Sequence, residues 1–162
     1  MSHPSLGRPP RDLAAGSPTA AQHIRAATDA LAARALESAV ERDPTLMTRY
    51  DELGLRERLH DAALLADRIA LSVAAGDPAP AREYADWTAP AYRRKRVPLD
   101  DIINLLEGLR SALPSVIDGR ADADADADAA IDAAITVYRW NRRLAGDARK
   151  RNAFLQLLYK GA

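Results

Sequence analysis

Apolar side chains recur every three or four positions over long stretches of this chain, and this spacing constrains its fold more than any other feature. The two clearest stripes are Leu55, Leu59, Ala62, Ala66, Ile69 and Val73, and then Ile102, Leu105, Leu106, Leu109, Leu113 and Val116. This spacing gives an α-helix one buried face. Since alanine is abundant and runs of β-branched residues are absent, we expect an all-α protein without a sheet.

Glycine and proline mark the ends of the helices in the first half of the chain. Ser17-Pro18 supplies a cap and a first-turn proline, which predicts a helix over residues 18–42. Asp43-Pro44 repeats this signal and predicts a short helix that Gly54 ends. The helix that carries the first apolar stripe then runs over residues 55–75.

The second half shows the same punctuation. After Gly76, Asp77-Pro78 opens a helix that closes at the basic run 93–96, and Pro90 is expected to bend it. Val97-Pro98 opens the helix of the second apolar stripe. The last segment is predicted to be one helix broken at Gly146, or two helices.

Length and composition fit one helical domain. At 162 residues with 48% hydrophobic content, the chain predicts a flexible N-terminal arm over residues 1–16 and one domain over residues 17–162. The absence of cysteine excludes disulfides and thiol chemistry. Basic and acidic residues balance at 23 each, and no apolar run could span a bilayer. We therefore expect a cytoplasmic protein with neither nucleic acid nor membrane as its partner.

An alternating Ala-Asp repeat occupies residues 120–129. Spaced carboxylates invite a metal-site interpretation, because hard cations bind oxygen ligands. Alternation on a helix, however, scatters the carboxylates around the axis. We therefore predict a solvated loop or the start of a helix here.

A family resemblance begins at the helix over residues 55–75. It rests on three parts of the sequence: Arg58-Leu59-His60-Asp61, then Ala74-Ala75-Gly76-Asp77-Pro78, and then Tyr92 followed by Val97-Pro98-Leu99. Asp77 lies sixteen residues after Asp61. This pattern resembles the phycobiliproteins, which have Cys-Leu-Arg-Asp, the same step to an Ala-Gly-Asp turn, and a tyrosine shortly before Thr-Pro. The match covers residues 55–116, and this chain has one residue fewer than the phycobiliproteins between Asp77 and Pro98.

The resemblance implies a globin-like fold of the phycobiliprotein type, with about six helices. The helix over residues 55–75 would form one wall of a tetrapyrrole-sized cleft, and the helix that holds Tyr84 and Tyr92 would form the other. Arg58 replaces the bilin-attaching cysteine, so covalent attachment is excluded, and His60 replaces an arginine. The chain before this helix is too short for the extra N-terminal helical pair of light-harvesting proteins. It is similar instead to globins of bilin biosynthesis and to haem-free globin domains of stressosome-type signalling proteins.

The resemblance also implies candidate site residues. Asp61 would accept hydrogen bonds from pyrrole nitrogens, or else be an exposed helix-face carboxylate. His60 would be the axial metal ligand of a haem or corrinoid, or else a surface histidine. Tyr84, Trp87 and Tyr92 would stack on a flat ring or close the core, with the core favoured for Tyr92 and the pocket for Trp87.

Two functions remain open, and neither is enzymatic, because no catalytic motif is present. The first is non-covalent binding of a tetrapyrrole (bilin, cobalamin or haem) by a carrier or sensor. The second is a haem-free signalling module that acts through dimerisation or partner docking. A homodimer is expected in both. The basic run 93–96 fits a solvated helix end best, although a ligand carboxylate or nucleic acid would also suit it.

Overall fold

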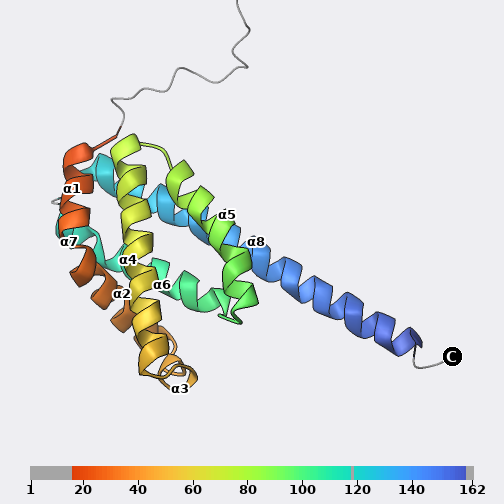
Figure 1. The fold of residues 1–162 in the computed structure, drawn as a ribbon. Coiled ribbons are helices and arrows are strands. Elements are labelled where there is room, and N and C mark those ends of the chain that lie inside the picture. Colours follow the sequence, from red (N-terminus) through yellow and green to blue (C-terminus); the bar gives the residue numbers. More distant parts are fainter. Residues whose placement is uncertain (1–15, 118, 160–162) are drawn as a thin grey trace, which may run out of the picture.

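The computed structural model describes residues 16–117 and 119–159, with side chains up to residue 146. Its described part contains eight helical segments and no strand, which confirms the all-α prediction (Figure 1). They are α1 (Pro18–Ala26), α2 (Thr28–Arg42), α3 (Leu46–Arg49), α4 (Glu52–Ala75), α5 (Ala79–Arg94), α6 (Leu99–Ala112), α7 (Pro114–Ile117) and α8 (Ala121–Tyr159). Six are nine residues or longer, and α3 and α7 are single turns.

The helices share one apolar core. α4 packs against α1 and α2 on one side and against α5 on the other, while α6 packs against α2 and α8 (Figure 1). The crossing of α2 and α6 is close, because a Cβ at Gly108 would lie 2.6 Å from the carbonyl oxygen of Ala35. Glycine is therefore required where these helices touch. The largest fully buried side chains include Ile24, Leu31, Ile69, Ile102, Leu105, Leu106 and Tyr138.

The predicted first helix over residues 18–42 is wrong, because the chain breaks into α1 and α2 at Ala27. The Thr28 hydroxyl donates to the carbonyl oxygen of Arg25 at 2.9 Å. A hydroxyl that donates to a backbone carbonyl in this way competes with the backbone hydrogen bonds of the helix. The break lets α1 pack on α4 while α2 packs on both α4 and α6.

The short helix predicted to end at Gly54 is also wrong. α3 ends at Arg49, Tyr50 is extended, and Asp51 then caps α4 by accepting a hydrogen bond from the Gly54 N–H at 2.8 Å. An aspartate at the N-cap satisfies one of the free N–H groups of a first turn. Gly54 therefore belongs to the beginning of a helix.

The turn from α4 to α5 follows the prediction. Gly76 adopts the left-handed conformation with φ of 59°, and Asp77 accepts a hydrogen bond from the Ala79 N–H at 2.9 Å. Pro90 lies inside α5 without ending it. The second apolar stripe is divided, because α6 ends at Ala112 and Val116 lies in α7.

The Ala-Asp repeat is helical, and its loop alternative is wrong. Ala123 and Ala127, one turn apart, are buried in the core, because residues four apart share a helix face. Asp128 and Asp132 lie on another face and pair with Arg110. The break expected at Gly146 is wrong as well, since α8 continues through this residue.

The predicted arm over residues 1–16 lies outside the described residues except for Gly16. That glycine is not part of a free arm, because it packs against the end of α4. A Cβ there would lie 2.2 Å from the Ala74 carbonyl oxygen, and the Ser17 N–H donates to the Val73 carbonyl oxygen at 2.8 Å. None of the described helices combines the length and apolar character needed to cross a membrane.

Candidate functional site

The candidate residues come from the two helices that the resemblance pairs. α4 carries His60 and Asp61, and α5 carries Tyr84, Trp87 and Tyr92. These helices pack against each other directly. The structure brings Asp61 and Tyr92 into contact, because the Tyr92 hydroxyl donates a hydrogen bond to Asp61 Oδ1 at 2.9 Å.

Arg58 completes this contact from one turn earlier in α4. Its Nε lies 2.9 Å from Asp61 Oδ2, an ion pair in which the N–H does not point along the hydrogen-bond direction. The spacing of three residues places both side chains on one helix face. Asp61 therefore has one oxygen against a tyrosine hydroxyl and the other against a guanidinium.

The Arg58 guanidinium is buried between two aromatic rings. Its central carbon lies 5.2 Å from the centre of the Tyr50 ring and 5.9 Å from that of Tyr92, and the residue is 2% exposed. A cation over an aromatic face is attracted by the ring quadrupole. Arg58 Nη1 is buried without a hydrogen-bond partner in the described part of the chain.

Burial governs the ionisation of this cluster. It raises the pKa of Asp61 above its usual range, although the Arg58 charge and the Tyr92 hydrogen bond act in the opposite direction. Burial, followed by the charge of Asp61, also raises the pKa values of Tyr92 and Tyr84. The tyrosines remain hydrogen-bond donors throughout the physiological range.

Tyr84 and Trp87 lie differently from Tyr92. Tyr84 is partly buried against the core, and its ring centre is 6.3 Å from that of Trp87. Trp87 is 77% exposed and does not line the opening that Asp61 and Tyr92 border. The structure therefore places Tyr92 in the core, as the sequence favours, but does not bring Trp87 to the cluster.

His60 is exposed and borders two openings. One, of about 330 Å³, also has Arg58, Asp61 and Tyr92 in its wall, and the other, of about 270 Å³, lies toward α2. No group of three or more histidine, aspartate or glutamate side chains in the described part is arranged to hold a metal ion. A metal at His60 would therefore need its remaining ligands from a bound molecule.

A neighbouring polar cluster was not predicted from the sequence. Asp101 of α6 is 1% exposed, accepts a hydrogen bond from the Tyr50 hydroxyl at 2.6 Å and pairs with Arg49. Burial and this bond raise the pKa of Tyr50 to about 12. Because the Tyr50 ring also covers Arg58, the two clusters adjoin. In the sequence Asp101 is one of two adjacent aspartates in the first turn of α6, so nothing distinguished it from an ordinary helix start.

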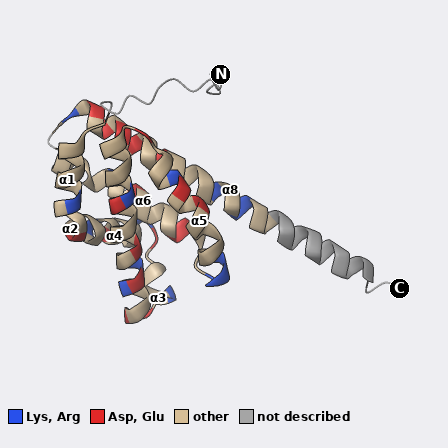
Figure 2. Ribbon diagram, turned by 45° about the horizontal axis from the view of Figure 1, so that its top comes forward, with Lys and Arg blue, Asp and Glu red and all other residues tan. Residues whose placement is uncertain are grey.

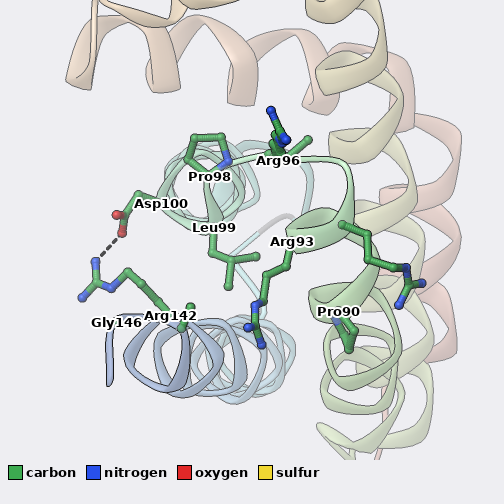
Figure 3. Close-up of a pocket in the computed structure, with 11 residues that line it drawn as sticks. Pro90, Arg93, Arg96, Pro98, Leu99, Asp100, Arg142 and Gly146 are labelled. Atoms are coloured by element: carbon green, nitrogen blue, oxygen red, sulfur yellow. Dashed lines mark hydrogen bonds and ion pairs between the residues drawn. The ribbon is translucent and has the colours of Figure 1, made fainter. Parts of the chain in front are cut away.

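A basic groove lies at the C-terminal end of α5, between the α5–α6 turn and α8 (Figure 3). Its volume is about 900 Å³, and it is lined by Pro90, Arg93, Arg94, Arg96, Val97, Pro98, Leu99, Asp100, Arg142, Ala145 and Gly146. In Figure 3, Arg93 and Leu99 point into the space between α5 and α8, and Arg142 reaches across to Asp100. Basic residues also gather visibly at this end of α5 in Figure 2.

No protein-family model matches this chain, and no curated protein matches it in sequence.

Proposed function

We propose that this chain is a non-catalytic, globin-like helical module that acts by docking to a protein partner, in the manner of haem-free stress-signalling globins. The observation that carries the proposal is the internal neutralisation of Asp61. Its Oδ1 accepts from Tyr92, and its Oδ2 lies 2.9 Å from Arg58. Pyrrole N–H groups would have to compete with the Tyr92 hydroxyl and the Arg58 charge for this carboxylate, although its Oδ2 accepts no hydrogen bond within the described part. Arg58, which stands in place of the attaching cysteine, thus forms an ion pair with the carboxylate that, by the resemblance, would bind a pigment.

The space around the cluster supports the same proposal. The opening beside Asp61 has about 330 Å³, at the low end of the range of ligand pockets. Charged side chains, among them Arg56, Glu57 and Lys95, make up much of its wall. Trp87, the aromatic residue for which the sequence favours the pocket, does not line this opening. A small opening with a charged wall suits a module that presents its surface to a partner.

Non-covalent tetrapyrrole binding is the second candidate, and one observation favours it. Arg58 Nη1 is a buried donor without a partner in the described part of the chain, and it belongs to a residue that borders the same opening as His60 and Asp61. A carboxylate of an entering ligand would satisfy it. The homodimer and the cytoplasmic location expected from the sequence belong to both candidates.

An absorption titration separates the candidates. The wild-type protein would be titrated with biliverdin, haemin and cobalamin, and the same series repeated with Asp61→Ala, His60→Ala and, as a surface control on α5, Trp87→Ala. The docking proposal predicts no saturable spectral change with any of the three. A saturable change that weakens in Asp61→Ala or His60→Ala but not in Trp87→Ala would overturn it in favour of the pigment-binding candidate. Light scattering on the same samples would test the homodimer.

A further inference from the structure

We infer that the groove between the α5–α6 turn and α8 binds an acidic peptide segment of a partner protein. This inference rests on the proposed function, since it supplies the contact surface for docking. The groove has about 900 Å³ of space, and four arginines lie in its wall: Arg93, Arg94, Arg96 and Arg142. Asp100 is the sole carboxylate among the lining residues.

Three of these arginines have no ion-pair partner among the described residues. Arg142 pairs with Asp100, but Arg93, Arg94 and Arg96 form no ion pair with any described residue. The chain has as many acidic as basic residues, so this concentration reflects separation of charge within a neutral protein. Guanidinium groups in a concave surface suit carboxylates, which they bind through paired, charge-assisted hydrogen bonds.

The backbone of the turn gives a second, independent observation. Arg96 has φ of 59°, the one positive φ of a non-glycine residue in the described part. The Val97 N–H donates to the Tyr92 carbonyl oxygen and the Arg96 N–H to that of Arg93, which is the pattern in which glycine normally follows a helix. The helix dipole accounts for arginines in the last turn of α5, but not for one in the left-handed position beyond it. The chain keeps an arginine where glycine would be less strained.

The uncharged part of the wall identifies the kind of partner. Pro90, Pro98 and Ala145 provide apolar surface between the arginines, with the largely buried Leu99 behind them, and no aromatic residue is among the described lining residues. Single-stranded nucleic acids bind in basic grooves by stacking bases on aromatic rings. An extended peptide that alternates acidic and apolar residues would instead turn its carboxylates to the arginines and its apolar side chains to Pro90, Pro98 and Ala145. The lining therefore favours a peptide over a nucleic acid.

Fluorescence anisotropy with the full chain tests the inference. The probe is a labelled short peptide that alternates Glu and Leu, with the Gln–Leu peptide and a single-stranded oligouridine as comparisons. The protein variants are Arg93→Ala, Arg96→Gly and Arg82→Ala. Arg82 is the matched control, because it is an exposed arginine of the same helix that lies outside the groove and forms no ion pair with a described residue.

We expect salt-sensitive binding of the Glu–Leu peptide, about tenfold weaker in Arg93→Ala and unchanged in Arg82→Ala. Arg96→Gly should weaken binding while raising the thermal midpoint, a pair of effects that a purely structural role would not produce. Equal binding by Arg93→Ala and the wild type, equal binding of the Gln–Leu peptide, or no binding at all would overturn the inference. Tighter binding of oligouridine would also overturn it and identify a nucleic-acid surface. These failures leave the docking proposal standing, since the pigment titration tests that separately.

Discussion

Arg58 is the residue on which the interior of the α4–α5 contact depends. It neutralises Asp61, whose side chain is 13% exposed, and fills the space between the rings of Tyr50 and Tyr92. Removal of one partner from a buried ion pair leaves the other charge uncompensated. The position that the resemblance assigns to a pigment-attaching cysteine thus has a structural role here.

Arg58→Ala should lower the free energy of unfolding by about 3 kcal/mol, because the Asp61 carboxylate would be left buried without its cation. Urea denaturation followed by circular dichroism measures this loss. Arg56→Ala is the control, since Arg56 pairs with Glu52 on the exposed surface of the same helix, and its effect should stay within about 0.5 kcal/mol. Equal effects of the two substitutions would contradict the role assigned to Arg58.

The ionisation of Asp61 makes a testable contribution to the pH dependence of stability. Its pKa in the unfolded chain is near 3.8 and is higher in the folded state, chiefly because of burial. Between these two values the folded protein binds the proton more tightly, so stability should fall as the pH rises through this window.

Asp61→Asn lacks this titration and should have a flatter stability profile above pH 3.8 than the wild type. The test compares urea unfolding of both proteins in steps from acid to neutral pH. The difference in unfolding free energy between wild type and variant should decrease with rising pH and then stay constant. Two parallel profiles would show that the folded pKa of Asp61 is not raised.

Among the elements, the crossing of α2 and α6 depends on the absence of one side chain. A methyl group at Gly108 would meet the backbone of Ala35 at 2.6 Å, and a backbone cannot give way as the end of a side chain can. Glycine has a low helix propensity, so its presence inside α6 needs such a packing reason.

Gly108→Ala should therefore destabilise the protein by about 1–3 kcal/mol, despite the gain in helix propensity. Gly146→Ala is the matched control, because a Cβ there has no atom within 4 Å, and it should stabilise by up to about 1 kcal/mol. Thermal unfolding of both variants gives the comparison. Stabilisation by Gly108→Ala would mean that α2 and α6 lie farther apart.

In the first turns of α8, two alanines with the same sequence neighbours differ in burial. Ala127 is 3% exposed within the core, whereas Ala125 in the same repeat is exposed. Ala127→Asp would bury a carboxylate without a partner and should cost about 3 kcal/mol. Ala125→Asp should cost within about 0.5 kcal/mol. Similar denaturation midpoints for the two would indicate that the repeat does not pack as a helix against the core.

At the scale of the whole molecule, one core holds the long helices while both tryptophans remain in water. Trp87 is 77% exposed and Trp140 is 56% exposed, and these are the two tryptophans of the chain. Large exposed apolar side chains often contribute to interaction surfaces when they occur together in one patch. Here they lie on α5 and α8, the helices that also line the basic groove.

Tryptophan emission should therefore change little when the protein unfolds in urea, although the helical circular dichroism disappears in one transition. The reason is that the indole rings are hydrated both before and after unfolding. Spectra of Trp87→Phe and Trp140→Phe assign the small residual change to one ring. A large red shift on unfolding would show that a tryptophan is buried in the native protein, as it would be in an interface between two copies.

Much of the helical content and its boundaries followed from local signals. Gly76 and Asp77 act at the end of α4 through bonds within a few residues, so the α4–α5 turn could be predicted. The break at Ala27 could not, because its advantage is the packing of α1 and α2 on different neighbours. Asp61 and Tyr92 were named in advance through the resemblance, whereas Arg58 was noted only for what it replaces.

The sequence alone determined that the protein is helical and where several of its helices begin and end, because helical period and capping are local properties. The tertiary structure decided how the Asp61 carboxylate is neutralised, since the cation over Tyr50 and Tyr92 depends on the α3–α4 connection and α5 both meeting α4. It also decided that the arginines at the end of α5 border a groove, because α8 approaches them from a distant part of the chain. Charges that cancel in the composition act separately once folding has placed them on different surfaces.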